Sequence, residues 1–164
     1  MIRHGIAEDR DDFAKTEKDD ALRPLTPVGR KKLKHAAAVL RRVLRSIDVL
    51  GSSPLLRAMQ TAEIIAKEYG GIDIVRIPAL VPGKSPEEFR AWLRGQRSEA
   101  SIAVVGHEPD LGEVATWLLC GQRESRIHIG KGGVCALELP GSADAGTAEL
   151  HWLLTPELLR KLPD

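Results

Sequence analysis

Hydrophobic positions along this chain alternate between two spacings, and the alternation predicts strands followed by helices. Short apolar runs such as IDVLGSS (47–53) and SIAVVGHEP (101–109) are typical of buried strands. From Pro27 to about Arg45, apolar residues instead recur every three or four positions, which predicts an amphipathic helix. Its apolar stripe would be Leu33, Ala37, Leu40, Leu44 and Ile47.

The same reasoning locates the remaining elements. We expect strands at 72–78, 133–140 and 148–156, the last two paired as a hairpin, and helices from Pro54, over 85–95 and over 109–121. Four hydroxyl residues stand directly before proline, and each fits an N-cap followed by proline at the first helical position: Thr26, Ser53, Ser85 and Thr155. Glu88 completes a capping box with Ser85.

This order of elements predicts one α/β domain over residues 1–164, a three-layer α/β/α fold whose central sheet is mostly parallel and covered by helices on both faces. The charged segment, residues 7–24, fits poorly because it has no convincing period. Connections of this length are commonly functional, and we hypothesise that it closes over a substrate. The first strand is so short that we expect the natural chain to start upstream of Met1.

Composition removes several classes of function. The chain has 164 residues and a net charge of +1, so its charge does not indicate nucleic acid as a partner. No apolar run is long enough to cross a membrane. Cys120 and Cys135 have no metal-binding spacing and are expected to be small buried residues in a reducing compartment. We therefore expect a soluble, cytoplasmic, monomeric protein.

Candidate chemistry lies where the predicted strands end. Arg3, His4 and Gly5 follow the first strand, Ser53 and Arg57 follow the second in SSPLLRAMQTAE (52–63), and His107 ends the strand at 101–109. Because the carboxyl ends of parallel strands meet at one sheet edge, these side chains should converge. Arginine forks and helix N-termini match a doubly charged anion such as phosphate or sulfate.

The histidines could catalyse a reaction of the bound anion. A neutral imidazole can attack phosphorus and hold the phosphoryl group covalently. Flanking arginines disfavour a charged ring and so keep His4 neutral near neutral pH. Gly5 is expected to let the backbone turn sharply towards the phosphate.

Three motifs, RHG at 3–5, SSPLLRAMQTAE at 52–63 and GHEPDL at 106–111, resemble the histidine phosphatase superfamily, whose fold is phosphoglycerate mutase-like. LRPLT (22–26), KGGV (131–134) and WLLTP (152–156) resemble its small SixA-type phosphohistidine phosphatase branch. The resemblance implies that His4 is the nucleophile, that Arg3, Arg57 and His107 bind the phosphoryl group, and that Ser53 and Arg23 line the pocket. No metal or other cofactor is implied, since fixed cations can stabilise the charge.

One departure from the superfamily concerns the general acid. Larger members carry an inserted segment that supplies a glutamate as the general acid. The corresponding stretch here, at 78–89, is short, and its Glu87 and Glu88 lie in the next predicted helix. Glu8, Asp20 or Glu108 could supply the proton instead. An imidazole leaving group needs less help than an alkoxide, and a missing insertion leaves room for a protein surface. Both points favour phosphohistidine on a protein as substrate.

The resulting prediction is a metal-independent phosphatase that forms a phosphohistidine intermediate on His4 and acts on a phosphorylated signalling or phosphotransfer protein. A small-molecule phosphomonoesterase or mutase of the same superfamily is one alternative. A module that binds phosphorylated partners without turnover is another.

Overall fold

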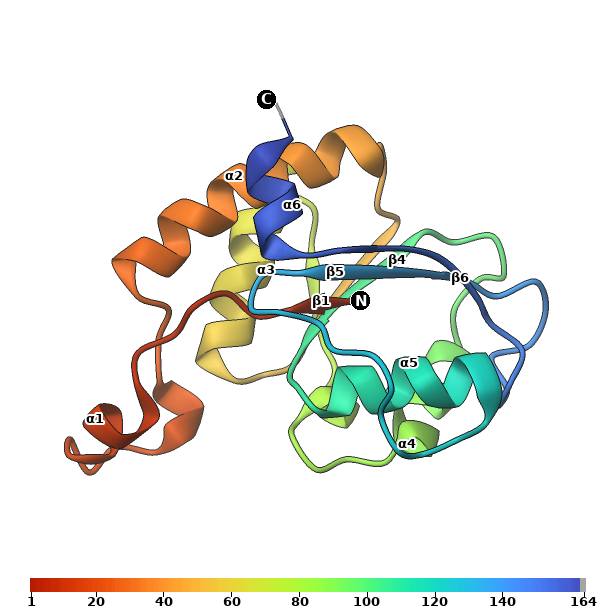
Figure 1. Ribbon diagram of the computed structural model, residues 1–164, viewed down its shortest axis with the longest axis horizontal. Helices are drawn as coiled ribbons and strands as arrows, with labels where there is room; N and C mark the ends of the chain where they lie inside the picture. The colour runs from red at the N-terminus through yellow and green to blue at the C-terminus, as the bar shows by residue number, and fades with distance from the viewer. Residues whose placement is uncertain (163–164) are drawn as a thin grey trace.

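A computed structural model describes residues 1–162, and a six-stranded sheet runs through its centre (Figure 1). The strands lie in the order β3-β2-β4-β1-β5-β6. Their bounds are Ile2–Arg3 for β1, Val49–Ser52 for β2, Ile74–Arg76 for β3, Ile102–Gly106 for β4, Val134–Glu138 for β5 and Glu149–Leu154 for β6.

Strand directions confirm a mostly parallel sheet. Strands β1, β4, β2 and β3 pair in parallel, whereas β5 runs antiparallel to both β1 and β6. The expected hairpin of the last two strands is confirmed by the β5–β6 pairing. The parallel part places four strand carboxyl ends at one edge, where an α/β fold commonly binds its ligand.

Helices cover both faces of the sheet, so the predicted three layers are present (Figure 1). One face carries α2 (Pro27–Val43), α3 (Leu56–Glu68) and α6 (Pro156–Lys161), and the other carries α4 (Pro86–Leu93) and α5 (Asp110–Cys120). Among residues 1–162, no helix is both long and apolar enough to span a membrane.

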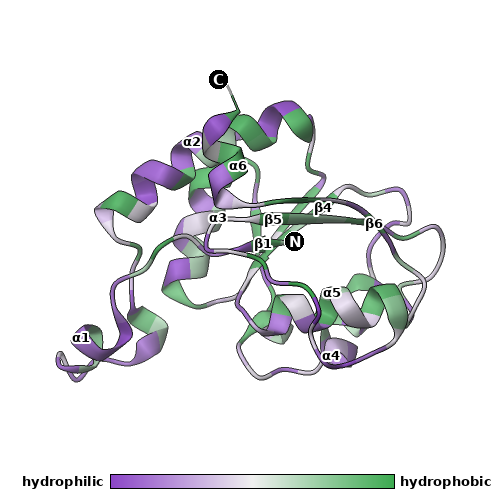
Figure 2. Cartoon of the chain, in the orientation of Figure 1, coloured by the Kyte–Doolittle hydropathy of each residue, from purple (hydrophilic) through white to green (hydrophobic). Residues whose placement is uncertain are grey.

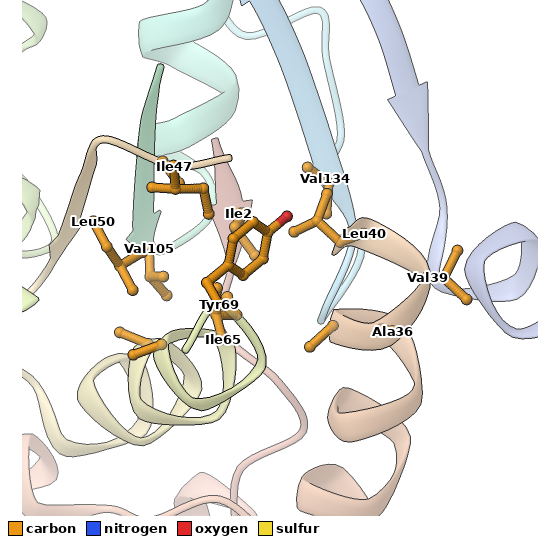
Figure 3. Packing of buried hydrophobic residues seen from close by; sticks show 14 of the residues in the cluster. Ile2, Ala36, Val39, Leu40, Ile47, Leu50, Ile65, Tyr69, Val105 and Val134 are labelled. Atoms are coloured by element: carbon orange, nitrogen blue, oxygen red, sulfur yellow. The ribbon is translucent and has the colours of Figure 1, made fainter. Parts of the chain in front are cut away.

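Aliphatic side chains fill the space between the sheet and the first helical layer (Figure 3). There the Tyr69 ring lies among residues of four strands and two helices: Ile2, Leu50, Val105, Val134, Leu40 and Ile65. Burying each such large side chain contributes about 1.5–3 kcal/mol to stability. The predicted stripe of α2 holds at Leu33, Ala37 and Leu40, which are 2–3% exposed.

Three of the four predicted caps are confirmed. Thr26, Ser85 and Thr155 accept backbone N–H bonds at the starts of α2, α4 and α6, and the capping box at Ser85 is complete. Ser53 is not a cap: α3 begins at Leu56, and no side chain caps it. The Ser53 hydroxyl accepts a long bond from the Leu55 amide at 3.4 Å and lies 2.9 Å from Nε2 of His107.

Two further expectations need correction. Cys120 is exposed, because α5 ends there and Gly121 takes a left-handed conformation at φ 75°, whereas Cys135 is buried as predicted. The charged segment contains regular structure, α1 (Arg10–Ala14) and the 3-10 helix η1 (Asp20–Leu22). Asp9 caps α1, which projects at one end of the molecule and is mostly hydrophilic (Figure 2).

Candidate active site

The sheet brings three strand ends together. Arg3 of β1 stands beside Gly106 of β4, and the amide of His4 donates to the Gly106 carbonyl at 3.1 Å. The amide of Ser53, after β2, donates to the Val105 carbonyl of the same β4 at 2.9 Å. Side chains from three distant parts of the chain, at His4, Ser53 and His107, therefore gather at one edge as expected.

His4 is held in one tautomer and is neutral. Its Nδ1 lies 2.7 Å from the carbonyl oxygen of Gly5, which can only accept, so Nδ1 carries the hydrogen and Nε2 keeps its lone pair. Burial lowers the pKa of His4 to about 4; the Gly5 bond opposes this, and the Arg57, Arg3 and Arg23 charges add to it. The sequence argument gave the arginines the main part, but burial is the larger cause.

His107 faces His4. The two ring centroids are 5.1 Å apart with their planes inclined by 55°, and His107 is 3% exposed. Its Nε2 lies 2.9 Å from the Ser53 hydroxyl, which is fully buried. Burial is the main cause that lowers the pKa of His107 to about 3, and the nearby His4 and Arg57 add smaller effects. Both rings are thus neutral near neutral pH.

Arg57, on the first turn of α3, is 2% exposed. Its Nη1 donates to the Asp20 carbonyl at 3.0 Å and lies 3.1 Å from the Asp20 carboxylate, while its Nε is buried with no partner. Thr61, which the sequence argument missed, donates to the Arg57 carbonyl at 2.8 Å and accepts from the Gly5 amide at 3.1 Å. Thr61 thereby ties α3 to the loop after His4.

Arg3 is anchored in the same way. Its Nη1 donates to the Ile129 carbonyl at 3.0 Å, and its Nε is also buried with no partner. In Arg3 and Arg57 alike, a fixed Nη1 leaves the edge formed by Nε and Nη2 available. That edge is the fork with which arginine binds two oxygens of a phosphate.

Arg23 is also in the site, although it comes from the charged segment. It is 8% exposed; its Nε donates to the Asp20 carboxylate at 2.7 Å, and its Nη1 donates to the Glu8 carbonyl at 2.8 Å. Burial pushes the pKa of Asp20 up, but Arg23 and Arg57 together outweigh it and hold that pKa below its usual value. Asp20 is therefore an anion bridging two arginines.

Glu108 lies close to Arg3 and to the Ile129 backbone that anchors Arg3. Its Oε1 accepts from the Ile129 amide at 3.1 Å, and the Ile129 carbonyl accepts from Arg3. Burial raises the pKa of Glu108, partly offset by the Ile129 bond and by Arg3. Of the possible acids, this carboxyl is the one beside His107 in sequence.

Glycine acts here differently from the prediction. Gly5 does not take a positive φ, and a Cβ there would make ordinary contacts of 3.4 Å or more. The close approach occurs at Gly29 of α2, where a Cβ would lie 2.1 Å from the Ile6 carbonyl oxygen. Gly29 thus lets α2 lie directly against the backbone after Gly5.

Two arginines with a buried, unpartnered Nε and a neutral histidine with a free Nε2 form a site that can bind a phosphoryl group and attack it. Comparison with known proteins indicates the same class of protein. The family model of the histidine phosphatase superfamily (branch 1) matches residues 1–81. An uncharacterized protein of Picosynechococcus sp. is 39% identical over 139 residues, covering 84% of this chain and 82% of the relative. The chain belongs to the histidine phosphatase superfamily.

Solved structures place it more narrowly. The protein histidine phosphatase SixA, solved with tungstate bound, superposes with a TM-score of 0.79 and 26% identity over 96% of each chain. A phosphoserine phosphatase of Entamoeba histolytica, solved with phosphoserine bound, reaches a TM-score of 0.68 and 17% identity over 96% of each chain, which shows a shared fold alone. The chain is thus a SixA-like member of a superfamily of phosphatases.

Proposed function

We propose that this protein is a metal-independent phosphatase that removes phosphate from a phosphohistidine on a signalling or phosphotransfer protein, through a covalent intermediate on His4. The observation that carries the proposal is the neutral His4 ring, with Nε2 unprotonated, close to the charges of Arg3 and Arg57, whose Nε atoms are both buried without a partner. A buried donor without a partner is costly unless a ligand accepts from it. A phosphoryl group would satisfy both.

In the first step, the lone pair of His4 Nε2 forms a bond to phosphorus while the bond from phosphorus to the substrate nitrogen breaks. His4 keeps its Nδ1 hydrogen, so the phosphorylated ring is a cation, and the Gly5 carbonyl accepts from that hydrogen at 2.7 Å. Arg3, Arg57 and His107 are proposed to stabilise the phosphoryl oxygens as charge develops.

In the second step, water attacks phosphorus and the bond from phosphorus to Nε2 breaks. The electron pair returns to the His4 ring, which becomes the starting neutral imidazole, and inorganic phosphate leaves. Because Nδ1 holds its hydrogen throughout, His4 needs no base of its own.

The substrate's leaving nitrogen needs a proton, and the three candidate carboxyls differ in their capacity to give one. Asp20 is engaged by two arginines and its pKa is lowered, so it holds no proton near neutral pH. Glu108 has a raised pKa, and we propose it as the proton donor. Its carboxylate would take a proton back from the attacking water in the second step, which restores the starting state. The Glu8 backbone binds Arg23, but no contact directs its carboxyl to the site.

Two observations support phosphohistidine over a small phosphate ester. The SixA structure resembles this chain over nearly its full length, and that protein is named as a protein histidine phosphatase. An imidazole is also a weaker base than an alkoxide, so it leaves readily with a single half-buried carboxyl as donor.

The test uses a histidine-phosphorylated carrier protein labelled on phosphorus, mixed with this protein at neutral pH in the presence of a chelator. We expect label to leave the carrier and to appear transiently, in acid-labile form, on this chain. His4→Ala should abolish both, whereas His151→Ala, on the exposed edge strand β6, should change neither.

Other outcomes decide between the alternatives. Turnover of small phosphate esters without loss of label from the carrier would mean a small-molecule phosphomonoesterase or mutase. Tight binding of the phosphorylated carrier with no turnover, unchanged in His4→Ala, would mean a binding module.

A further inference from the structure

Asp20 joins the two arginines of the site that come from outside the first strand. Its Oδ1 lies 2.7 Å from Arg23 Nε and its Oδ2 lies 3.1 Å from Arg57 Nη1. Its backbone carbonyl accepts from the same Nη1 at 3.0 Å. The arginine side chains are 9% and 2% exposed but the Asp20 side chain is 44% exposed, so one half-exposed carboxylate is the counter-ion of two buried guanidinium groups. The exposed Arg10 lies further off, with its Nε 4.0 Å from Oδ1.

The local fold holds Asp20 in this position. Asp19 caps η1 by accepting from the Ala21 amide at 2.8 Å, and this bond fixes the turn that carries Asp20. Arg23 closes the other end of the turn through its bond to the Glu8 carbonyl. The charged segment is therefore fastened to the site by the ion pairs of Asp20.

A carboxylate beside a phosphate-binding arginine could act in two ways: it could occupy the place of the phosphate, or it could hold the arginine for it. Arginine has five N–H donors, and Asp20 contacts Arg57 only at Nη1. The unpartnered Nε lies on the other edge of the guanidinium. A phosphoryl group on that edge and Asp20 on Nη1 do not compete for the same donors.

We propose that Asp20 is a positioning residue, which holds Arg57 by Nη1 so that its Nε and Nη2 edge meets the phosphoryl group, and which balances the buried charge of Arg23. The inference rests on the proposed function and deepens it. Asp20 is not the acid of the reaction, and its anionic form is the working one throughout the neutral range.

This role separates two measurable quantities. Removal of the negative charge leaves Arg3, Arg23 and Arg57 as a more positive group, so a phosphate-like anion binds at least as well as before. Turnover falls, because an arginine that has lost its anchor is misaligned at the transition state. Collapse of the site would instead weaken anion binding and turnover together.

The experiment compares Asp20→Asn with Asp12→Asn, using p-nitrophenyl phosphate as substrate and tungstate as inhibitor. Asp12 is a matched control, since it lies in the same charged segment and pairs with Lys15 on the surface. We expect kcat to fall about 10- to 100-fold in Asp20→Asn with a tungstate inhibition constant that stays level or falls. Asp12→Asn should match the wild type in both.

Two results would overturn the proposal: an Asp20→Asn variant within about twofold of Asp12→Asn in kcat, or a parallel loss of kcat and tungstate affinity. Asp20→Ala assayed with added formate is a second, independent test, because the half-exposed position admits a small carboxylate. Formate should restore part of kcat in Asp20→Ala alone. The absence of any restoration would count against the proposal.

His4→Ala separates this inference from the proposed function. If His4→Ala hydrolyses the ester as well as the wild type, the proposed function is wrong whatever Asp20 does. If turnover depends on His4 and the Asp20 variants behave like Asp12→Asn, the function stands and the positioning role is wrong.

Discussion

Leu50 and Ser53 are three residues apart at the end of β2, and they belong to two buried regions that follow opposite rules. Leu50 is 1% exposed and lies in a cluster of buried hydrophobic side chains. Ser53 is fully buried in a polar cluster with two histidines and an arginine, His4, His107 and Arg57. At this site the Nε atoms of Arg57 and of the neighbouring Arg3 have no partner, at a cost of about 1–3 kcal/mol each.

The difference shows which region is built for stability. An aliphatic cluster gains free energy from each side chain that leaves water, whereas a polar cluster gains only where every donor is matched. Proteins commonly break the rules of stable packing at functional sites. Mutations in the two regions should therefore separate stability from activity.

The largest expected effect is on activity. Arg57→Ala should lower kcat/KM for p-nitrophenyl phosphate by about 10²- to 10³-fold, because one set of transition-state donors is lost. Arg57→Lys should recover little, since lysine keeps the charge but lacks the fork. Steady-state kinetics make the measurement. Arg126→Ala, at an exposed arginine paired with Glu124, is the control and should leave kcat/KM unchanged.

The next effect is on stability. Leu50→Ala should lower the free energy of unfolding by about 2–5 kcal/mol, through lost transfer free energy and a cavity beneath β2. Urea denaturation gives this value, and activity per folded molecule should match the wild type. A large loss of specific activity in a fully folded Leu50→Ala sample would mean that the two regions are coupled.

A change of pH should reveal the buried histidines. Folding lowers the pKa of His4 to about 4 and of His107 to about 3, from the ordinary 6.5. Between the folded and unfolded pKa values the unfolded chain binds more protons than the folded chain. The free energy of unfolding is therefore highest above about pH 6.5 and falls as the pH drops below it. Each histidine should remove about 2 kcal/mol between about pH 7.5 and pH 5. Urea midpoints at the two pH values test this, with a smaller difference expected in His4→Ala.

The smallest effect should come from Ser53→Ala, which removes the hydroxyl bonded to His107. We expect a fall in kcat of about three- to tenfold, because the His107 ring loses its fixed orientation. Ser85→Ala makes the same chemical change at the capping box of α4, where it should cost about 1 kcal/mol of stability and no activity. Equal kinetics for both variants would contradict a role of Ser53 in the site.

The regions also differ in how well the sequence predicts them. The helix from Pro27 and the strand that ends at Gly106 were predicted within a few residues, because their periodic apolar pattern is local. His4, Arg57 and His107 converge as expected, since parallel topology brings strand ends together.

Contacts that depend on tertiary structure escaped prediction. The hydroxyl of Ser53 had two possible partners, a helix N-terminus and His107, and only the folded chain brings the second one near. Asp20 was considered solely as an acid, because no local pattern shows that Arg23 and Arg57 bind it. Asp9 as a cap, with Asp11 and Asp12 in the first turn, is a helix-start signal that could have located α1.

Strand β1, only two residues long, pairs with β4 on one side and with β5 on the other. The ribosome makes the His4 strand before both of its sheet neighbours, which lie about a hundred residues later in the chain. A nascent chain that has not reached Gly106 lacks the carbonyl that binds the His4 amide, and one that has not reached Val134 lacks the second neighbour of Ile2. The order of synthesis thus delays assembly of the site, and enzymatic activity during translation would report that β4 and β5 have joined β1.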